Sequence, residues 1–251
     1  MSDLAGMPPV VVLDDVHMRY RIFEDGGRRA RAQRLLRGKR GRTMREVHAL
    51  KGVSITIPHG QRLGLIGRNG SGKSTMLSIV AGLLTPTEGR VLASSYPVLL
   101  GISAALNKEL SGHSNVILGC TALGMRRTEA LDRASEIIAY AGLEEFAHVP
   151  MRAYSAGMRA RLNFSIATVV EPEILLIDEA LAAGDARFRR RSRDRVREIT
   201  ERAGSVVLVS HSTKEVRDMC DRVVWLDKGS IVMDGPADEV TAAYDESEGA
   251  T

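Results

Sequence analysis

The stretch Gly67 to Thr75, with the sequence GRNGSGKST, constrains this chain more than any other. It follows the pattern Gly-x-x-x-x-Gly-Lys-Ser, whose glycines let the backbone turn tightly enough for its N–H groups to converge on a phosphate chain. Residues 61–66 before it read as a short buried strand, and residues 73–81 after it read as a helix that Gly82 ends. A strand, a glycine-rich loop and a helix in this order predict an α/β fold with a phosphate site at the helix N-terminus.

Within this loop we expect Lys73 to reach the β- and γ-phosphates of a nucleotide and Ser74 to ligate Mg²⁺. The backbone around them supplies further donors. The alternative is a glycine-rich surface turn, which the flanking strand and helix disfavour. The residues expected at the nucleotide are Gly67, Arg68, Asn69, Gly70, Ser71, Gly72, Lys73, Ser74 and Thr75.

Two further apolar runs end in residues that suit phosphate chemistry. The run 174–179 (ILLIDE) predicts a buried parallel strand with Asp178 and Glu179 at its C-terminal end, where open α/β sheets bind ligands. We expect Asp178 to hold Mg²⁺ and Glu179 to polarise the attacking water. The run 205–210 predicts another buried strand, and His211 at its end can donate to a γ-phosphate oxygen.

Two features before the glycine-rich loop each allow more than one interpretation. Tyr20 follows the first predicted strand, 10–16, and its ring can either stack on adenine or pack on the sheet edge. The segment 28–45 holds nine basic residues and no acidic one, with a small apolar stripe at helical spacing. It suits an anionic membrane surface, a solvated loop or nucleic acid, although no aromatic residue is interleaved for base stacking.

Composition limits the class of protein. The chain has 251 residues, consistent with one large domain or a domain with an insert. We see no apolar run of ~18 residues that would span a membrane, and no secretory signal at the N-terminus. Cys120 and Cys220 lie far apart and form no C-x-x-C, which fits a reducing cytosol rather than disulfide or zinc chemistry.

Residues 107–150 differ in character from the rest and predict a helical insert. Thr128 is expected to cap a helix whose buried face holds Leu131, Ala134, Ile138 and Ala141. At the other end of the chain, residues 236–244 predict one short terminal helix. The polar residues 245–251 are expected to fray.

The order of these motifs resembles that of the ABC ATPases. Just before ILLIDE stands Tyr154-Ser155-Ala156-Gly157-Met158, which resembles the signature motif usually written LSGGQ. The Ala183-Gly184-Asp185 turn and His211 follow in the family's order, with Tyr20 as its adenine-stacking aromatic. The resemblance covers nearly the whole chain and implies that Ser155, Gly157 and Asp185 also serve ATP.

The resemblance implies a P-loop α/β fold with a mostly parallel sheet, an antiparallel β subdomain and a helical insert carrying the signature. It implies one ABC ATPase domain over 1–251, with a catalytic core at about 10–106 and 160–235. The helical subdomain would occupy about 107–158, and the basic insert 21–46.

Two positions depart from the family pattern. ABC ATPases usually have a glutamine after the third strand that links ATP to the transmembrane partner, whereas the only glutamines here are Gln33 and Gln61. Ser103 or Asn107 can stand in for it. The signature also ends in Met158 rather than glutamine, although Ser155 and the Gly157 backbone can still serve a γ-phosphate.

The YSxGM signature and the Gly-Asp turn look like the subfamily that exports O-antigen and teichoic acid. This implies an ATPase, using ATP and Mg²⁺, that moves a lipid-linked polysaccharide of teichoic-acid, O-antigen or galactan type with a six-helix membrane permease. It would lie peripherally on the cytoplasmic face of the cell membrane and would not bind nucleic acid. The alternative from another class is a soluble ABC-type ATPase acting on nucleic acid or ribosomes; an ABC importer fits the signature less well.

Hydrolysis is expected to require a second copy of the chain, because the signature lies too far along the helical insert to reach its own phosphate. The residues after about 235 are too few for a separate sugar-binding domain, so we expect the permease to select the polymer.

Overall fold

The computed structural model describes residues 7–24, 43–100, 106–178 and 186–249, and its centre is a six-stranded sheet. The strand order is β5-β6-β7-β3-β8-β9; all neighbours run parallel except β8 and β9. These strands span Val98–Leu100 (β5), Ile174–Ile177 (β6), Ser205–Val209 (β7), Arg62–Ile66 (β3), Arg222–Asp227 (β8) and Ser230–Pro236 (β9). The predicted parallel α/β core is therefore confirmed.

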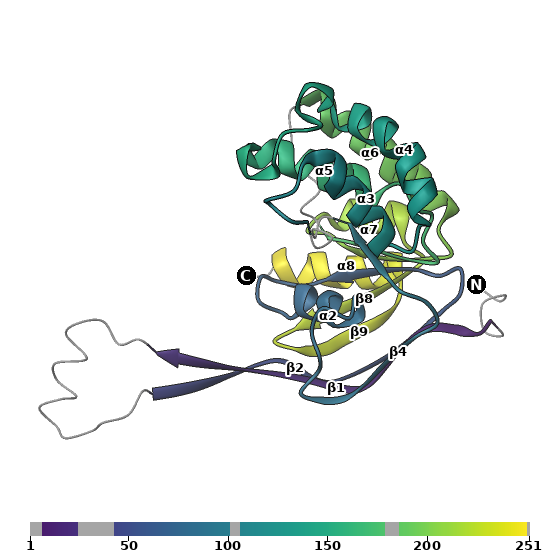
Figure 1. Cartoon of the computed structure of the whole chain (residues 1–251). Coiled ribbons are helices and arrows are strands. Elements are labelled where there is room, and N and C mark those ends of the chain that lie inside the picture. Colours follow the sequence, from purple (N-terminus) through teal and green to yellow (C-terminus); the bar gives the residue numbers. More distant parts are fainter. Residues whose placement is uncertain (1–6, 25–42, 101–105, 179–185, 250–251) are drawn as a thin grey trace, which may run out of the picture.

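A second sheet of three antiparallel strands, ordered β2-β1-β4, covers helix α2 (Lys73–Val80) (Figure 1). It is formed by β1 (Pro9–Glu24), β2 (Thr43–Pro58) and β4 (Glu88–Ala93). Strand β1 is longer than the predicted strand 10–16, because it stays paired with β2 out to Glu24 and Thr43. Figure 1 shows this pair running out from the body as a two-stranded ribbon.

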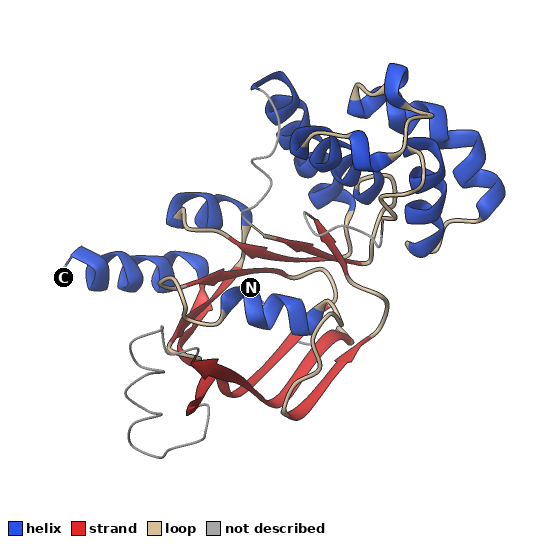
Figure 2. Ribbon diagram, turned by 60° about the vertical axis from the view of Figure 1, so that its left-hand side comes forward, coloured by secondary structure: helices blue, strands red, loops and turns tan. Residues whose placement is uncertain are grey.

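The main sheet is buried on both faces, as a parallel sheet requires. On β6, Ile174 and Leu176 pack with α2 (Lys73–Val80) and the antiparallel sheet, whereas Leu175 and Ile177 pack on the opposite side. That opposite side is covered by α6 (Ala186–Arg202), α7 (Thr213–Met219) and α8 (Ala237–Gly249). Figure 2 shows α2 enclosed between strands, which fixes the helix that starts at the glycine-rich loop.

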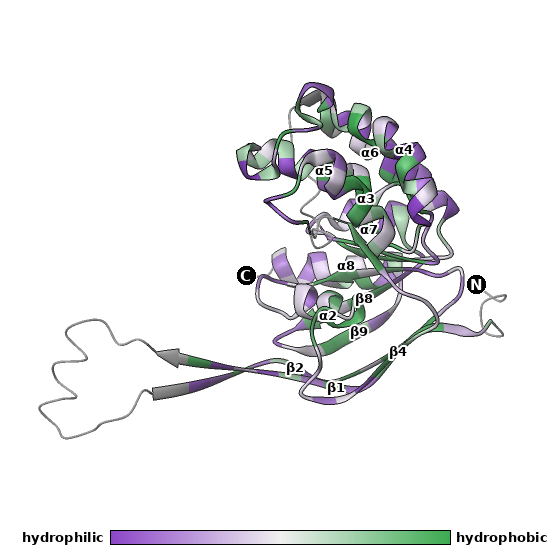
Figure 3. Ribbon diagram, in the orientation of Figure 1, coloured by the Kyte–Doolittle hydropathy of each residue, from purple (hydrophilic) through white to green (hydrophobic). Residues whose placement is uncertain are grey.

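A third hydrophobic cluster holds a group of helices together above the sheet. They are α3 (Gly112–Ala122), α4 (Arg127–Ala141) and α5 (Ala156–Ala167), with short 3₁₀ turns at Glu144–Phe146 and Met151–Ala153. Figure 3 shows hydrophilic residues on the outer turns of α4. Within the described ranges, none of the helices has the length and apolar character needed to cross a bilayer.

Two details of these helices differ from the sequence predictions. Thr128 is not a cap, because α4 begins one residue earlier and its N-cap is Arg126, whose side chain makes no capping bond. Leu131 is 44% exposed, while Ala130 and Ile137 are buried instead. The buried face of α4 is thus rotated from the predicted stripe.

The end of the chain was also predicted wrongly over most of its length. Helix α8 continues to Gly249, so residues 245–249 are helical rather than frayed. The Tyr244 ring packs edge-on against Trp225, with ring centroids 5.4 Å apart. Asp245 accepts from Arg217 at 3.3 Å, so tertiary contacts hold these last turns on the sheet.

Candidate active site

The glycine-rich loop joins β3 to α2 and folds around the Lys73 side chain. Lys73 is 6% exposed, and its ammonium donates to Gly67 O at 2.5 Å and to Arg68 O at 3.0 Å. Gly72 is the N-cap of α2 with a φ of 113°, a conformation that L side chains rarely adopt. The loop therefore presents a buried cation at a helix N-terminus, as a phosphate site requires.

The back of this loop is closed by the turn between β8 and β9. Gly229 N donates to Ser71 O at 2.9 Å, and Gly229 O accepts from Lys51 N at 2.8 Å. A Cβ on Gly67 would lie 2.1 Å from Leu226 O, so this position has no room for a side chain. The Ser71 hydroxyl is buried and, among the described residues, has no hydrogen-bond partner.

The ends of three adjacent strands bring the other predicted residues beside the loop. Strand β7 lies between β6 and β3, and its Leu208 is in register with both Ile177 and Gly64. Asp178 follows Ile177 directly, while His211 comes three residues after Leu208. Since parallel strands end on one edge, Asp178, His211 and the loop share that edge within about two strand spacings, ~10 Å.

Other predicted residues fall outside the described ranges. They are Glu179, Asp185 and Ser103, together with most of the basic insert. Asn107, the other candidate for the missing glutamine, is described and exposed; its Oδ1 accepts from Glu109 N at 2.9 Å. Buried Asn115 holds the backbone of this segment through Asn107 N and O, which sequence reasoning missed.

Tyr20 lies on β1 opposite Val47 of β2. Ala49 lies two residues after Val47 on β2, and its carbonyl oxygen is 2.6 Å from the position that a Cβ on Gly72 would occupy. The strand pair thus places the partly buried Tyr20 ring near the glycine-rich loop. The ring packs against the hydrophobic cluster that α2 forms with the two sheets. The packing interpretation of this ring is confirmed, and base stacking on its exposed part stays a prediction.

The signature-like residues lie at the start of α5, in the helical part. Ser155 is the N-cap of α5, and its Oγ accepts from Met158 N at 3.2 Å. Ser155, Ala156 and Gly157 are exposed, so this helix N-terminus faces solvent. The preceding Tyr154 is buried and donates its hydroxyl to Phe146 O at 2.6 Å, which anchors the turn.

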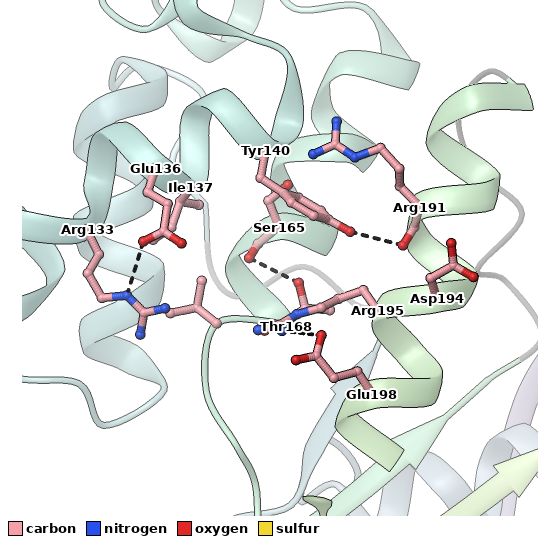
Figure 4. A pocket seen from close by; sticks show the side chains of 11 residues that line it. Arg133, Glu136, Ile137, Tyr140, Ser165, Thr168, Arg191, Asp194, Arg195 and Glu198 are labelled. Atoms are coloured by element: carbon pink, nitrogen blue, oxygen red, sulfur yellow. Dashed lines mark hydrogen bonds and ion pairs between the residues drawn. The ribbon is translucent and has the colours of Figure 1, made fainter. Parts of the chain in front are cut away.

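The opposite end of α5 is joined to α6 around a cavity of about 340 Å³ (Figure 4). Arg195 of α6 donates to Thr168 O at 2.8 Å, and a cation there complements the C-terminal end of α5. Tyr140 of α4 donates to Arg191 O at 3.2 Å, and the Arg191 guanidinium lies 4.5 Å from the centre of the Tyr140 ring. Burial raises the pKa of Tyr140, so its hydroxyl keeps its proton.

Neither cysteine belongs to the reactive chemistry. Cys220 lies behind β3, and burial raises the pKa of its thiol to about 12. Cys120 is fully buried in the helical part, and burial raises its pKa as well. Thiols held neutral in this way are poor nucleophiles and poor metal ligands.

Comparisons with known proteins agree with this geometry. The profile of the ABC transporter family matches residues 50–182. The O-antigen export system ATP-binding protein RfbB of Klebsiella pneumoniae is 36% identical over 247 residues, covering 95% of this chain and 98% of that protein. RfbB of Myxococcus xanthus is 42% identical over 216 residues, 85% of this chain, and here the chain spans about half (49%) of the relative's length.

The teichoic acids export ATP-binding protein TagH of Listeria monocytogenes is 40% identical over 203 residues, 81% of this chain and 61% of that protein. Among solved structures, the dimeric, post-hydrolysis ATP-binding cassette MJ0796 bound to ADP and Pi superimposes with a TM-score of 0.67. It covers 90% of this chain and 98% of its own at 24% identity, which shows the fold alone. The chain belongs to the ABC transporter family, and its motifs are those of the family's ATP-hydrolysing subunits.

Proposed function

We propose that this chain is the ATP-hydrolysing subunit of an exporter that moves a lipid-linked cell-surface polysaccharide across the cytoplasmic membrane. The observation that carries this is the shared sheet edge on which the Lys73 loop, Asp178 and His211 meet. The relatives named for O-antigen and teichoic-acid export support the choice of cargo.

The residues divide the work of phosphoryl transfer. Lys73 turns from the Gly67 and Arg68 carbonyls to the phosphates, while Ser74 and Asp178 hold Mg²⁺. Mg²⁺ supplies neutralisation of the charge that develops on the phosphate oxygens. Glu179 polarises the attacking water, His211 donates to the γ-phosphate, and adenine stacks on Tyr20.

Two copies of the chain form the working unit. The exposed N-terminus of α5 offers Ser155 Oγ and the N–H group of Gly157 to a phosphate. In a two-fold pair these groups would complete the site on the partner's glycine-rich loop, with Asp185 at the interface. The dimeric MJ0796 structure supports such an arrangement for a protein of the same fold.

The remaining partners are a six-helix permease and the inner surface of the membrane. In the sequence, the basic segment 28–45 connects β1 to β2, and the paired ends of these two strands project from the body (Figure 1). Nine cations near an anionic leaflet, at about 1 kcal/mol each, would hold this segment at the membrane surface. The subunit would then sit peripherally on the cytoplasmic face.

Deletion and complementation in the native organism test the export function. The deletion strain should lose surface polymer and accumulate lipid-linked polysaccharide inside the membrane. Wild type and Lys51→Ala, which changes an exposed lysine on β2, should restore export, whereas Lys73→Ala should not. Normal surface polymer in the deletion strain would contradict the proposal, and copurification from membranes would then identify the actual partner.

A further inference from the structure

The glycine-rich loop has an ion pair with the other end of the chain. Arg68 Nε donates to Glu248 Oε1 at 2.6 Å, across 180 residues of sequence. This carboxylate also raises the pKa of the Arg68 guanidinium. Nothing in the nucleotide motif itself calls for a partner on α8.

Glu248 is presented from a fixed position. On α8, Val240 is fully buried and Tyr244 packs edge-on against Trp225 of β8. Arg217 of α7 donates to Thr241 Oγ1 at 3.0 Å, one further point of attachment. The helix is therefore seated on the sheet from Val240 to Tyr244, about one turn before Glu248, which limits where its carboxylate can hold Arg68.

Arg68 in turn shapes the part of the loop that receives Lys73. Its carbonyl oxygen accepts from Lys73 Nζ at 3.0 Å and from Ser71 N at 3.1 Å. The side chain of Arg68 is thus held by α8, while its carbonyl oxygen holds the Ser71 turn and, until Lys73 turns to the phosphates, the lysine as well. Restraining this residue lowers the conformational entropy that the loop loses when it closes on phosphates.

We propose that Glu248 is a positioning residue for nucleotide binding, which acts through Arg68 to pre-organise the glycine-rich loop. This rests on the proposed ATPase function of the same site. Because both side chains are partly exposed, the pair contributes modestly, and we expect a two- to fivefold effect on ATP affinity, on the order of an exposed ion pair.

Nucleotide titration of the full chain tests this, with ATP and ADP as probes. Glu248→Gln should raise the Kd for both about two- to fivefold, since both carry the β-phosphate. Glu246→Gln is the matched control: it removes the same charge from an exposed residue of the same helix and should leave the Kd unchanged. At about 1 M salt, where the Debye length is ~3 Å, the difference between wild type and Glu248→Gln should shrink.

A double-mutant cycle separates positioning from a purely structural role. In an Arg68→Gln background, Glu248→Gln should have no further effect on the Kd, and the thermal midpoint without nucleotide should match that of Glu246→Gln. Equal Kd values for Glu248→Gln and Glu246→Gln, tighter ATP binding by Glu248→Gln, or additive effects with a lowered midpoint would each overturn the proposal. A wild-type chain that binds no ATP at all would contradict the proposed function instead.

Discussion

Gly67 is the residue whose replacement the loop tolerates least. Its φ is 144°, and a Cβ would overlap the Leu226 carbonyl oxygen at 2.1 Å, on a strand that cannot move without opening the sheet. We expect Gly67→Ala to lower the free energy of unfolding by about 3–5 kcal/mol, from backbone strain and overpacking together. Chemical denaturation of the purified variant measures this.

Gly70→Ala provides the matched control at the same loop. Gly70 has a φ of 81°, but a Cβ there meets no atom within 4 Å. Only the left-handed backbone penalty of about 1–2 kcal/mol should appear. Equal losses for the two variants would show that the contact with Leu226 is not the cause.

The candidate site residues that the sequence predicts are those that stand in a recognisable local motif. Lys73 stands in a fixed glycine pattern, and Asp178 and His211 each end an apolar strand. Glu248 gave no such signal, because its partner is 180 residues away and its own surroundings read as a polar tail. An ion pair between residues so far apart produces no recognisable pattern in the sequence around either of them.

At the scale of elements, the N-cap of α5 has both a structural and a functional part. Ser155 Oγ accepts from Met158 N at 3.2 Å, and replacing such a cap by alanine costs about 1 kcal/mol. Ser155→Ala should therefore lower stability slightly but abolish most ATP turnover, if the hydroxyl serves the partner's phosphate as we propose. Steady-state hydrolysis and thermal unfolding measure the two effects.

Ser111→Ala is the control, since Ser111 caps α3 in the same helical group and accepts from Ser114 N at 3.2 Å. Its stability loss should equal that of Ser155→Ala, with turnover retained. If both variants lose turnover equally, the cap of α5 has no phosphate role.

The basic segment 28–45 is expected to act at the membrane rather than at ATP. Replacing its arginines with glutamine should reduce export more than ATP hydrolysis, because it removes attraction to an anionic surface. Vesicle binding should fall, and more so at low salt, where screening is weakest. The control is a double variant, Arg190→Gln with Arg197→Gln, which removes two exposed charges from α6 and reports the effect of losing surface charge elsewhere. Equal losses of export and hydrolysis would indicate a folding role.

Elements were predicted best where one hydrophobic pattern dominates the local sequence. The continuous apolar runs of β6 and β7 were placed almost to the residue, because both faces of these strands are buried. The end of α8 was missed because cross-chain contacts, such as Tyr244 with Trp225, stabilise a stretch whose own sequence is polar. The paired length of β1 and β2 was underestimated for the same reason, since strand pairing is a tertiary property.

At the scale of the whole molecule, the two groups of residues that we propose as halves of a shared ATP site belong to different hydrophobic clusters. The glycine-rich loop is built on the sheet core, and the α5 N-terminus on the helical cluster. Of the two, the α5 N-terminus is the exposed one, whereas Lys73 of the glycine-rich loop is buried against its own carbonyl oxygens. The division of the chain into catalytic core, helical subdomain and basic insert stays a prediction, as do its exact boundaries.

The most direct test of this account is the oligomeric state of Glu179→Gln with ATP and Mg²⁺. Without the carboxylate that we propose polarises the attacking water, ATP should bind but not turn over, so the nucleotide should hold two copies together. Size-exclusion chromatography with light scattering should then show a dimer, which reverts to a monomer without ATP or when Lys73→Ala is added. A Glu179→Gln chain that stays monomeric at saturating ATP would contradict the shared site.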